Sequence, residues 1–174
     1  MKTILLSLLF FLFYKEILAQ NKQDTIHWRP NYKLKWEDFQ GTPDRKRWVA
    51  ATVCTFSYFY RYNDTGIYFT TYSYFIKNLS MADTLRTDEY GLVHEQGHFD
   101  ICEYYSRILL FRLRKANLNR YNINDASQRI CNEVQEERNQ MDALYDFETS
   151  HGTELDKQQE WNKKITLMLN ENAK

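Results

Sequence analysis

The pattern of apolar and polar positions along the chain changes character near residue 80. Before that point, residues 50–62 and 67–76 are rich in β-branched and aromatic side chains, and the turn-forming sequence Asn-Asp-Thr-Gly at 63–66 separates them. Such segments favour strands, and a short polar turn between two of them favours a hairpin. Because successive side chains of a strand point to opposite faces, we expect an antiparallel hairpin that is half buried.

After residue 80 the apolar residues recur at helical spacing. The pattern predicts helices over about 89–116, 124–147 and 154–169, with Thr87 or Asp88 capping the first of them. Strands first and helices afterwards are typical of an α+β domain, in which helices pack on one face of a small antiparallel sheet. The hairpin is therefore expected to pack against the long first helix, with the other helices beyond it.

The first twenty residues differ from the rest of the chain. A positive charge at Lys2 precedes an almost purely apolar run at 4–14, and small or polar residues follow at Ala19 and Gln20. These features are typical of a secretory signal peptide, with cleavage near Ala19 or Gln20. The apolar run is too short to span a bilayer comfortably. We therefore expect an exported protein, periplasmic or extracellular, without a stable membrane anchor after cleavage.

The size and charge of the remaining chain limit its class. Of 174 residues, 43% are hydrophobic, which suffices for one core, so residues 21–174 are predicted to form a single domain. The 23 Lys and Arg residues balance the 23 Asp and Glu residues. The chain therefore has no net positive charge that would attract a polyanion, which argues against nucleic acid as a partner.

Three cysteines, Cys54, Cys102 and Cys131, permit at most one internal disulfide. Disulfides persist in the compartments that exported proteins reach. Cys102 and Cys131 both fall in helix-like segments, so that pair is the preferred pairing among the possible ones. The alternative is that all three are small buried side chains.

The motif His94-Glu95-Gln96-Gly97-His98 lies inside the first predicted helix. Each residue of an α-helix advances by about 100°, so His94 and His98 point about 40° apart on one face and can reach one ion. Catalytic zinc takes three protein ligands and leaves a fourth position to water, and Glu95 is placed to accept a proton from that water. A glycine inside a helix is costly, so we expect Gly97 to allow close approach of the sheet or of a substrate backbone.

The motif does not supply the third ligand. The candidates are Glu103, Glu133, Glu136, Glu137 and His151. Glu103 lies about 140° around the helix from His98, so it cannot face the same ion unless the helix breaks. A glutamate of the second helix can reach an ion held by the first helix without unusual geometry. His151 lies in a loop beside Gly152, where the backbone can direct a side chain towards the ion. The spacing alone leaves these two possibilities open.

The sequence around the motif resembles a bacterial family of predicted secreted zinc-dependent proteases, long classed as a domain of unknown function. The likeness is carried by residues 92–103, 36–43 and 145–152, with Gln159 and Trp161. It implies a zincin-like fold and a zinc hydrolase acting on a peptide or protein. Asp100 stands where the general zincin pattern has a hydrophobic residue, and the family shares that Asp.

The resemblance also favours particular residues of the segment 145–152. It favours His151 as the third zinc ligand over the glutamates of the second helix. Tyr145 becomes a candidate hydrogen-bond donor to the oxyanion of the reaction, and Asp146 a candidate partner for an imidazole. The alternatives are a core tyrosine and a residue of the helix C-terminal turn.

Together these features predict an exported zinc-dependent hydrolase, most simply a metallopeptidase with Glu95 as general base. The alternative is an exported, non-catalytic binding domain with a vestigial or structural metal site. Glu95 distinguishes the two, because a binding domain has no need of a base beside its metal ligand.

Overall fold

A computed structural model of the protein describes residues 25–44, 49–64 and 66–171. The expected signal peptide at 1–20 lies outside the described residues. Within the described part of the chain, no helix is both long enough and apolar enough to cross a membrane.

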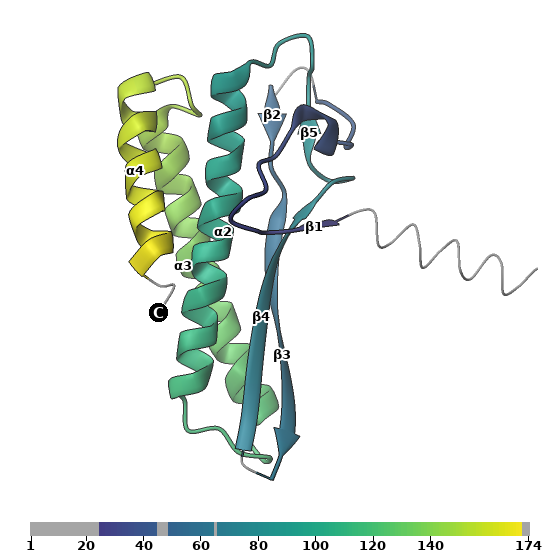
Figure 1. Ribbon diagram of the computed structural model, residues 1–174, viewed down its shortest axis with the longest axis vertical. Helices are drawn as coiled ribbons and strands as arrows, with labels where there is room; N and C mark the ends of the chain where they lie inside the picture. The colour runs from purple at the N-terminus through teal and green to yellow at the C-terminus, as the bar shows by residue number, and fades with distance from the viewer. Residues whose placement is uncertain (1–24, 45–48, 65, 172–174) are drawn as a thin grey trace, which may run out of the picture.

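A three-stranded antiparallel sheet forms one layer of the molecule (Figure 1). The predicted hairpin is β3 (Cys54–Asn63) and β4 (Gly66–Ile76), and β1 (Thr25–His27) pairs with the far end of β4. The first predicted strand was too long, because residues 50 and 51 form a separate short strand. This strand, β2 (Ala50–Ala51), pairs with β5 (Met81–Ala82) instead. A 3-10 helix, η1 (Trp36–Asp38), lies between β1 and β2.

Three helices form the rest of the molecule. Helix α2 (Glu89–Lys115) contacts β3 and β4 on one side and both other helices, α3 (Ile123–Thr149) and α4 (Leu155–Glu171), on the other (Figure 1). One face of the hairpin is buried, as the strand pattern predicts, and Phe56, Phe69 and Phe75 belong to the hydrophobic core. The α+β prediction is confirmed, and α2 is the element that every other layer contacts.

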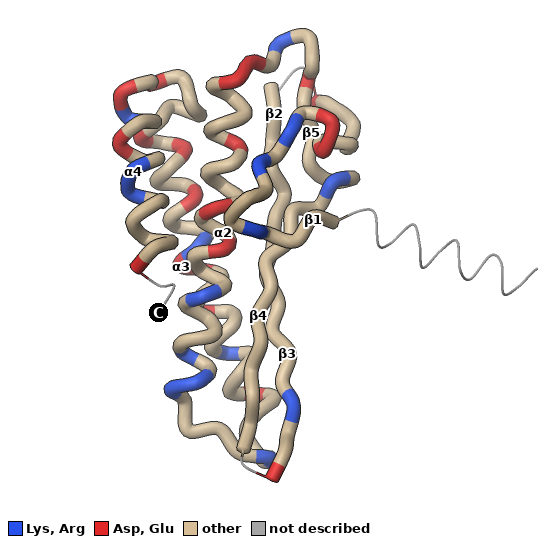
Figure 2. The backbone as a smooth tube through the Cα atoms, in the orientation of Figure 1, with Lys and Arg blue, Asp and Glu red and all other residues tan. Residues whose placement is uncertain are grey.

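The ends of α2 carry charges that suit the helix dipole. The carboxylate of Asp88 accepts a hydrogen bond from the backbone nitrogen of Gly91 at 2.8 Å, so Asp88 is the N-cap. Arg112, Arg114 and Lys115 lie in the last turn, where Figure 2 shows basic residues gathered at the lower end of the helix. Negative charge at the start and positive charge at the end both stabilise a helix.

The predicted Cys102–Cys131 disulfide is not present, because all three cysteines are free thiols. Cys102 on α2 instead lies near Cys54 on β3, and burial together with that neighbour raises the pKa of the Cys102 thiol. The preference for Cys131 was wrong because the sequence did not reveal which side of α2 faces the sheet.

Candidate metal centre

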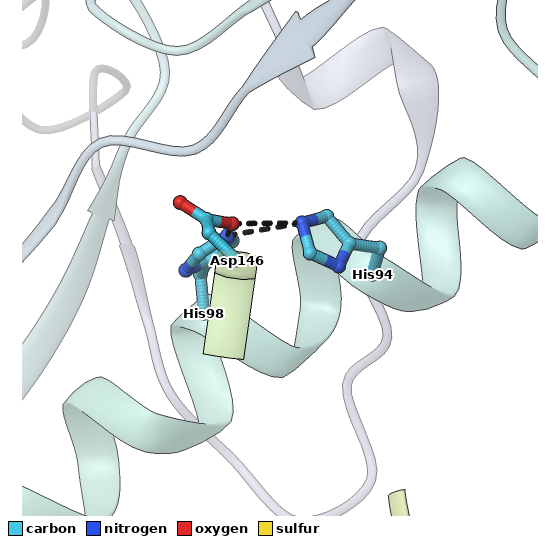
Figure 3. A group of neighbouring side chains, drawn as sticks. All are labelled: His94, His98 and Asp146. Carbon is cyan, nitrogen blue, oxygen red and sulfur yellow. Dashed lines mark hydrogen bonds and ion pairs between the residues drawn. The ribbon is translucent and has the colours of Figure 1, made fainter. Parts of the chain in front are cut away.

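Two helices bring three ligand-type side chains together. His94 and His98 lie one turn apart on α2, and Asp146 reaches them from α3 (Figure 3). The Nε2 atoms of the two histidines are 3.3 Å apart. Oδ1 of Asp146 lies 3.1 Å from Nε2 of His94 and 3.0 Å from Nε2 of His98. These three residues form a group that could hold a metal ion.

The size of this triangle fits a small, four-coordinate ion. When nitrogen and oxygen ligands bind a tetrahedral metal at about 2.0–2.1 Å, neighbouring ligand atoms lie roughly 3.3–3.4 Å apart. The edges of the triangle formed by His94, His98 and Asp146 measure 3.0–3.3 Å. The ligand atoms therefore need to separate by only a few tenths of an ångström to bind such an ion.

The hydrogen bonds behind the histidines determine which nitrogen faces the ion. Nδ1 of His98 lies 3.0 Å from Oδ1 of Asp142, and a carboxylate can only accept, so this nitrogen carries the proton. Nδ1 of His94 lies 3.0 Å from Oε1 of Gln158, whose amide nitrogen donates to the hydroxyl of Tyr145. In the neutral rings both Nε2 atoms then present lone pairs to the carboxylate of Asp146. Three acceptors facing one another require a cation between them.

In the metal-free protein a proton can take the place of that cation. Burial opposes a charged ring at His98, but hydrogen bonds to Asp142 and Asp146 outweigh it and raise its pKa to about 10. Burial likewise opposes a charged Asp146, but the two imidazoles lower its pKa below the ordinary value. The group is therefore built to hold positive charge at its centre.

Glu95 lies beside this group in a cleft of about 980 Å³. Its side chain is 6% exposed, and within the described residues its Oε2 atom has no hydrogen-bond partner. The cleft walls come from β2 and its flanking residues, from the start of α2 and from the loop between α3 and α4. A buried carboxylate oxygen without a partner is costly unless something in the cleft binds it.

Tyr145 packs behind the histidines and does not line the cleft. Its ring stacks on that of His94 with centroids 4.6 Å apart, and its hydroxyl donates to the His94 carbonyl at 3.1 Å. A Cβ atom at Gly97 would lie 2.7 Å from Cζ of Tyr145 and nearer still to the hydroxyl. Gly97 therefore makes room for a tyrosine, where we expected a strand or a substrate. The oxyanion role of Tyr145 stays a prediction, and the position of its hydroxyl favours a positioning role.

The loop after α3 carries His151 at the mouth of the cleft. Ser150 and His151 have positive φ angles of 48° and 53°, which are uncommon for residues other than glycine. Gly152 follows, and a Cβ atom there would lie 2.8 Å from Cβ of His94. The side chain of His151 is 58% exposed, and its Nδ1 lies 3.5 Å from Oδ1 of Asp146. His151 thus adjoins the group of three through Asp146.

The glutamates considered as third ligands are engaged or located elsewhere. Glu103 accepts hydrogen bonds from Ser73 and Arg107 on the sheet-facing side of α2. Glu137 forms a two-bond ion pair with Arg112, and Glu133 and Glu136 are exposed.

The sequence analysis expected Asp146 to contact an imidazole, which it does, but did not include it among the candidate metal ligands, and it missed Asp142 as the partner of His98. Both aspartates lie one turn apart on α3, as the two histidines do on α2. This matched spacing is the signal that could have identified them. Asp100, the departure from the zincin pattern, accepts hydrogen bonds from Trp28 and Gln96 and so joins the segment before η1 to α2.

Comparison of the chain with protein-family models, with curated proteins and with solved structures found no match.

Proposed function

We propose that the protein is an exported zinc-dependent hydrolase, a metallopeptidase in which His94, His98 and Asp146 hold the zinc and Glu95 is the general base. The observation that carries this proposal is the triangle of three acceptor atoms with edges of 3.0–3.3 Å. Asp142 and Gln158 orient the two imidazoles so that their lone pairs face the ion.

The ligand set supports zinc among the common metals. Two imidazoles and one carboxylate are typical of catalytic zinc, whereas calcium and magnesium prefer oxygen ligands throughout. When bound, zinc supplies a Lewis acid that polarises a water molecule and a substrate carbonyl. His151 remains the alternative third ligand, and its Nδ1 lies 3.5 Å from Oδ1 of Asp146.

The residues around the ion divide the remaining chemistry. Glu95, buried and with an oxygen free of hydrogen bonds within the described residues, accepts the proton of the attacking water. The same carboxyl group then passes the proton to the leaving nitrogen of a peptide bond. Tyr145 holds the backbone and ring of His94 in place and so acts as a positioning residue.

The cleft supports a peptide or protein as the substrate. It is about 980 Å³ in volume and includes a run of chain at 49–52 along one wall, whose backbone can bind an extended peptide. The resemblance to secreted zinc-dependent proteases agrees with this substrate and with a zincin-like fold. Export rests on the predicted signal peptide at 1–20.

A non-catalytic binding domain with a structural metal site is the second candidate. A structural zinc site is closed by four protein ligands, whereas this group offers three and lies in an open cleft. The Oε2 atom of Glu95, which has no hydrogen-bond partner within the described residues, can also accept a proton, a role that binding alone does not need. Both observations favour the enzyme.

The decisive experiment combines metal analysis with a peptidase assay on Glu95→Gln. We expect about one zinc per chain in the wild type and in this variant, and hydrolysis of a fluorogenic protein substrate that the variant reduces by roughly 10²–10⁴-fold. Glu136→Gln, which changes an exposed glutamate on α3, is the control and keeps full activity.

Three outcomes count against the proposal. Wild-type protein that binds no transition metal contradicts the metal site itself. Zinc without hydrolysis of any peptide bond in a diverse peptide library supports the binding domain instead. An unchanged rate in Glu95→Gln removes Glu95 from the mechanism.

A further inference from the structure

Two buried cysteines from different layers meet behind the metal group. Cys54 opens β3 and is 5% exposed, and Cys102 on α2 is completely buried. Each thiol shifts the pKa of the other, so the two lie close together. The two cysteines are 48 residues apart along the chain, so it is the packing of the sheet on α2 that brings them together.

A second contact places Cys54 at the same turn of α2. Its Sγ atom lies 3.6 Å from the carbonyl oxygen of His98, one helical turn before Cys102. In an α-helix that carbonyl accepts from the backbone nitrogen four residues later, which belongs to Cys102. Two independent contacts therefore place the thiol of Cys54 beside Cys102.

We propose that Cys54 and Cys102 form a disulfide that joins β3 to the turn of α2 directly after His98. In this step the S–H bonds of both residues break and one S–S bond forms. Two protons and two electrons pass to an oxidant of the disulfide class, such as oxidised glutathione, which is reduced to two thiols.

Cys131 is not a competing partner. It lies on α3, where it lines a shallow groove with Phe56 and Tyr58 on the flank of β3. Burial alone raises its pKa, whereas the thiols of Cys54 and Cys102 each interact with the other. Cys131 therefore stays a free thiol beside the bridge.

The disulfide would hold in place the residues that lie behind His98. Arg138 donates to Sγ of Cys54 at 3.1 Å and forms an ion pair with Asp142, the carboxylate that orients His98. A covalent link at Cys54 and Cys102 holds the start of β3, Arg138 and the histidine-bearing turn in one arrangement. Since both thiols are buried, the bond must form while the chain folds, before the core closes around them.

The test is refolding of the full chain from denaturant in a glutathione redox buffer, with Cys131→Ser as the matched variant. We expect both proteins to lose about two mass units, one disulfide's worth of hydrogen, and to yield a Cys54–Cys102 linked peptide after digestion without reductant. Adding reductant should lower the melting temperature of either protein by roughly 10 °C.

Cys54→Ser and Cys102→Ser should each refold without the mass loss. Fully reduced Cys131→Ser after refolding overturns the proposal, and so does a bridge to Cys131 in the wild type. The readout is a mass and a peptide map, so it does not depend on zinc or on peptidase activity.

Discussion

The buried side chains of α2 change in kind between the turn that carries the metal group and the end of the helix. In the turn that carries the metal group, His94, Glu95 and Gln96 are all less than 9% exposed. Towards the end of the helix the buried residues include Leu109 and Leu113, which join the hydrophobic core. Burying a polar group lowers the stability of the fold unless the group is hydrogen-bonded, whereas burying a leucine raises that stability. The leucine-bearing end thus stabilises the fold, and part of that stability offsets the cost of burying the polar side chains at 94–96.

The largest effect expected from this comparison separates metal affinity from stability. Asp146→Ala should weaken zinc binding by at least about a thousandfold, or about 4 kcal/mol, because it removes one of three ligands. Leu109→Ala should leave zinc affinity unchanged but lower the free energy of unfolding by about 2–5 kcal/mol, because Leu109 is fully buried. A chelator competition assay measures the affinity, and urea unfolding of the metal-free proteins measures the stability.

His151→Ala tests the alternative ligand in the same assay. If Asp146 is the third ligand, removal of the exposed His151 ring should weaken zinc binding by less than about tenfold. A greater loss in His151→Ala than in Asp146→Ala would assign the third position to His151 after all.

A pair of glycines within α2 gives the next largest effect. Gly97→Ala should lower the free energy of unfolding by about 1–3 kcal/mol, because the new Cβ atom collides with the Tyr145 ring. Gly91→Ala should raise it by about 0.4–1 kcal/mol, because its nearest neighbour, Asp88 Oδ1, would lie at an ordinary 3.4 Å. Urea unfolding of both variants measures the difference. Equal effects of the two substitutions would show that Tyr145 does not depend on the space at Gly97.

The last effect concerns pH and is small over any single pH unit. Burial opposes the charge of His98, but Asp142 and Asp146 raise its pKa from 6.5 to about 10 in the metal-free fold. The stabilisation from the charged ring is therefore complete below pH 6.5 and is lost as the pH rises towards 10. Zinc must displace this proton, so its affinity should rise about tenfold per pH unit, about 1.4 kcal/mol, between pH 7 and 9.

Proton release on zinc addition measures this displacement directly. In weakly buffered protein at pH 8 we expect about one proton per zinc, detected with an indicator dye. Asp142→Asn should release less, because the ring of His98 loses a carboxylate that holds its proton. Zinc binding without proton release in the wild type would contradict the raised pKa.

Local patterns sufficed to predict most of the fold. The helices predicted at 89–116, 124–147 and 154–169 correspond to Glu89–Lys115, Ile123–Thr149 and Leu155–Glu171. Their periodicity, and the cap of the first helix at Asp88, are properties of neighbouring residues, which the sequence displays directly. The predicted strand at 50–62 failed at its start because residues 50 and 51 pair with β5, about thirty residues further along the chain.

The sequence by itself determined that His94 and His98 share one helix face with Glu95 between them, since a regular helix fixes those directions. Only the tertiary structure decided what meets that face. The rotation and crossing of α3 bring Asp146 and Asp142 to the imidazoles, and the space at Gly97 admits Tyr145 behind them. The packing of β3 on α2 likewise brings Cys102 close to Cys54. These contacts depend on how distant segments pack, which the spacing of residues along the chain does not determine.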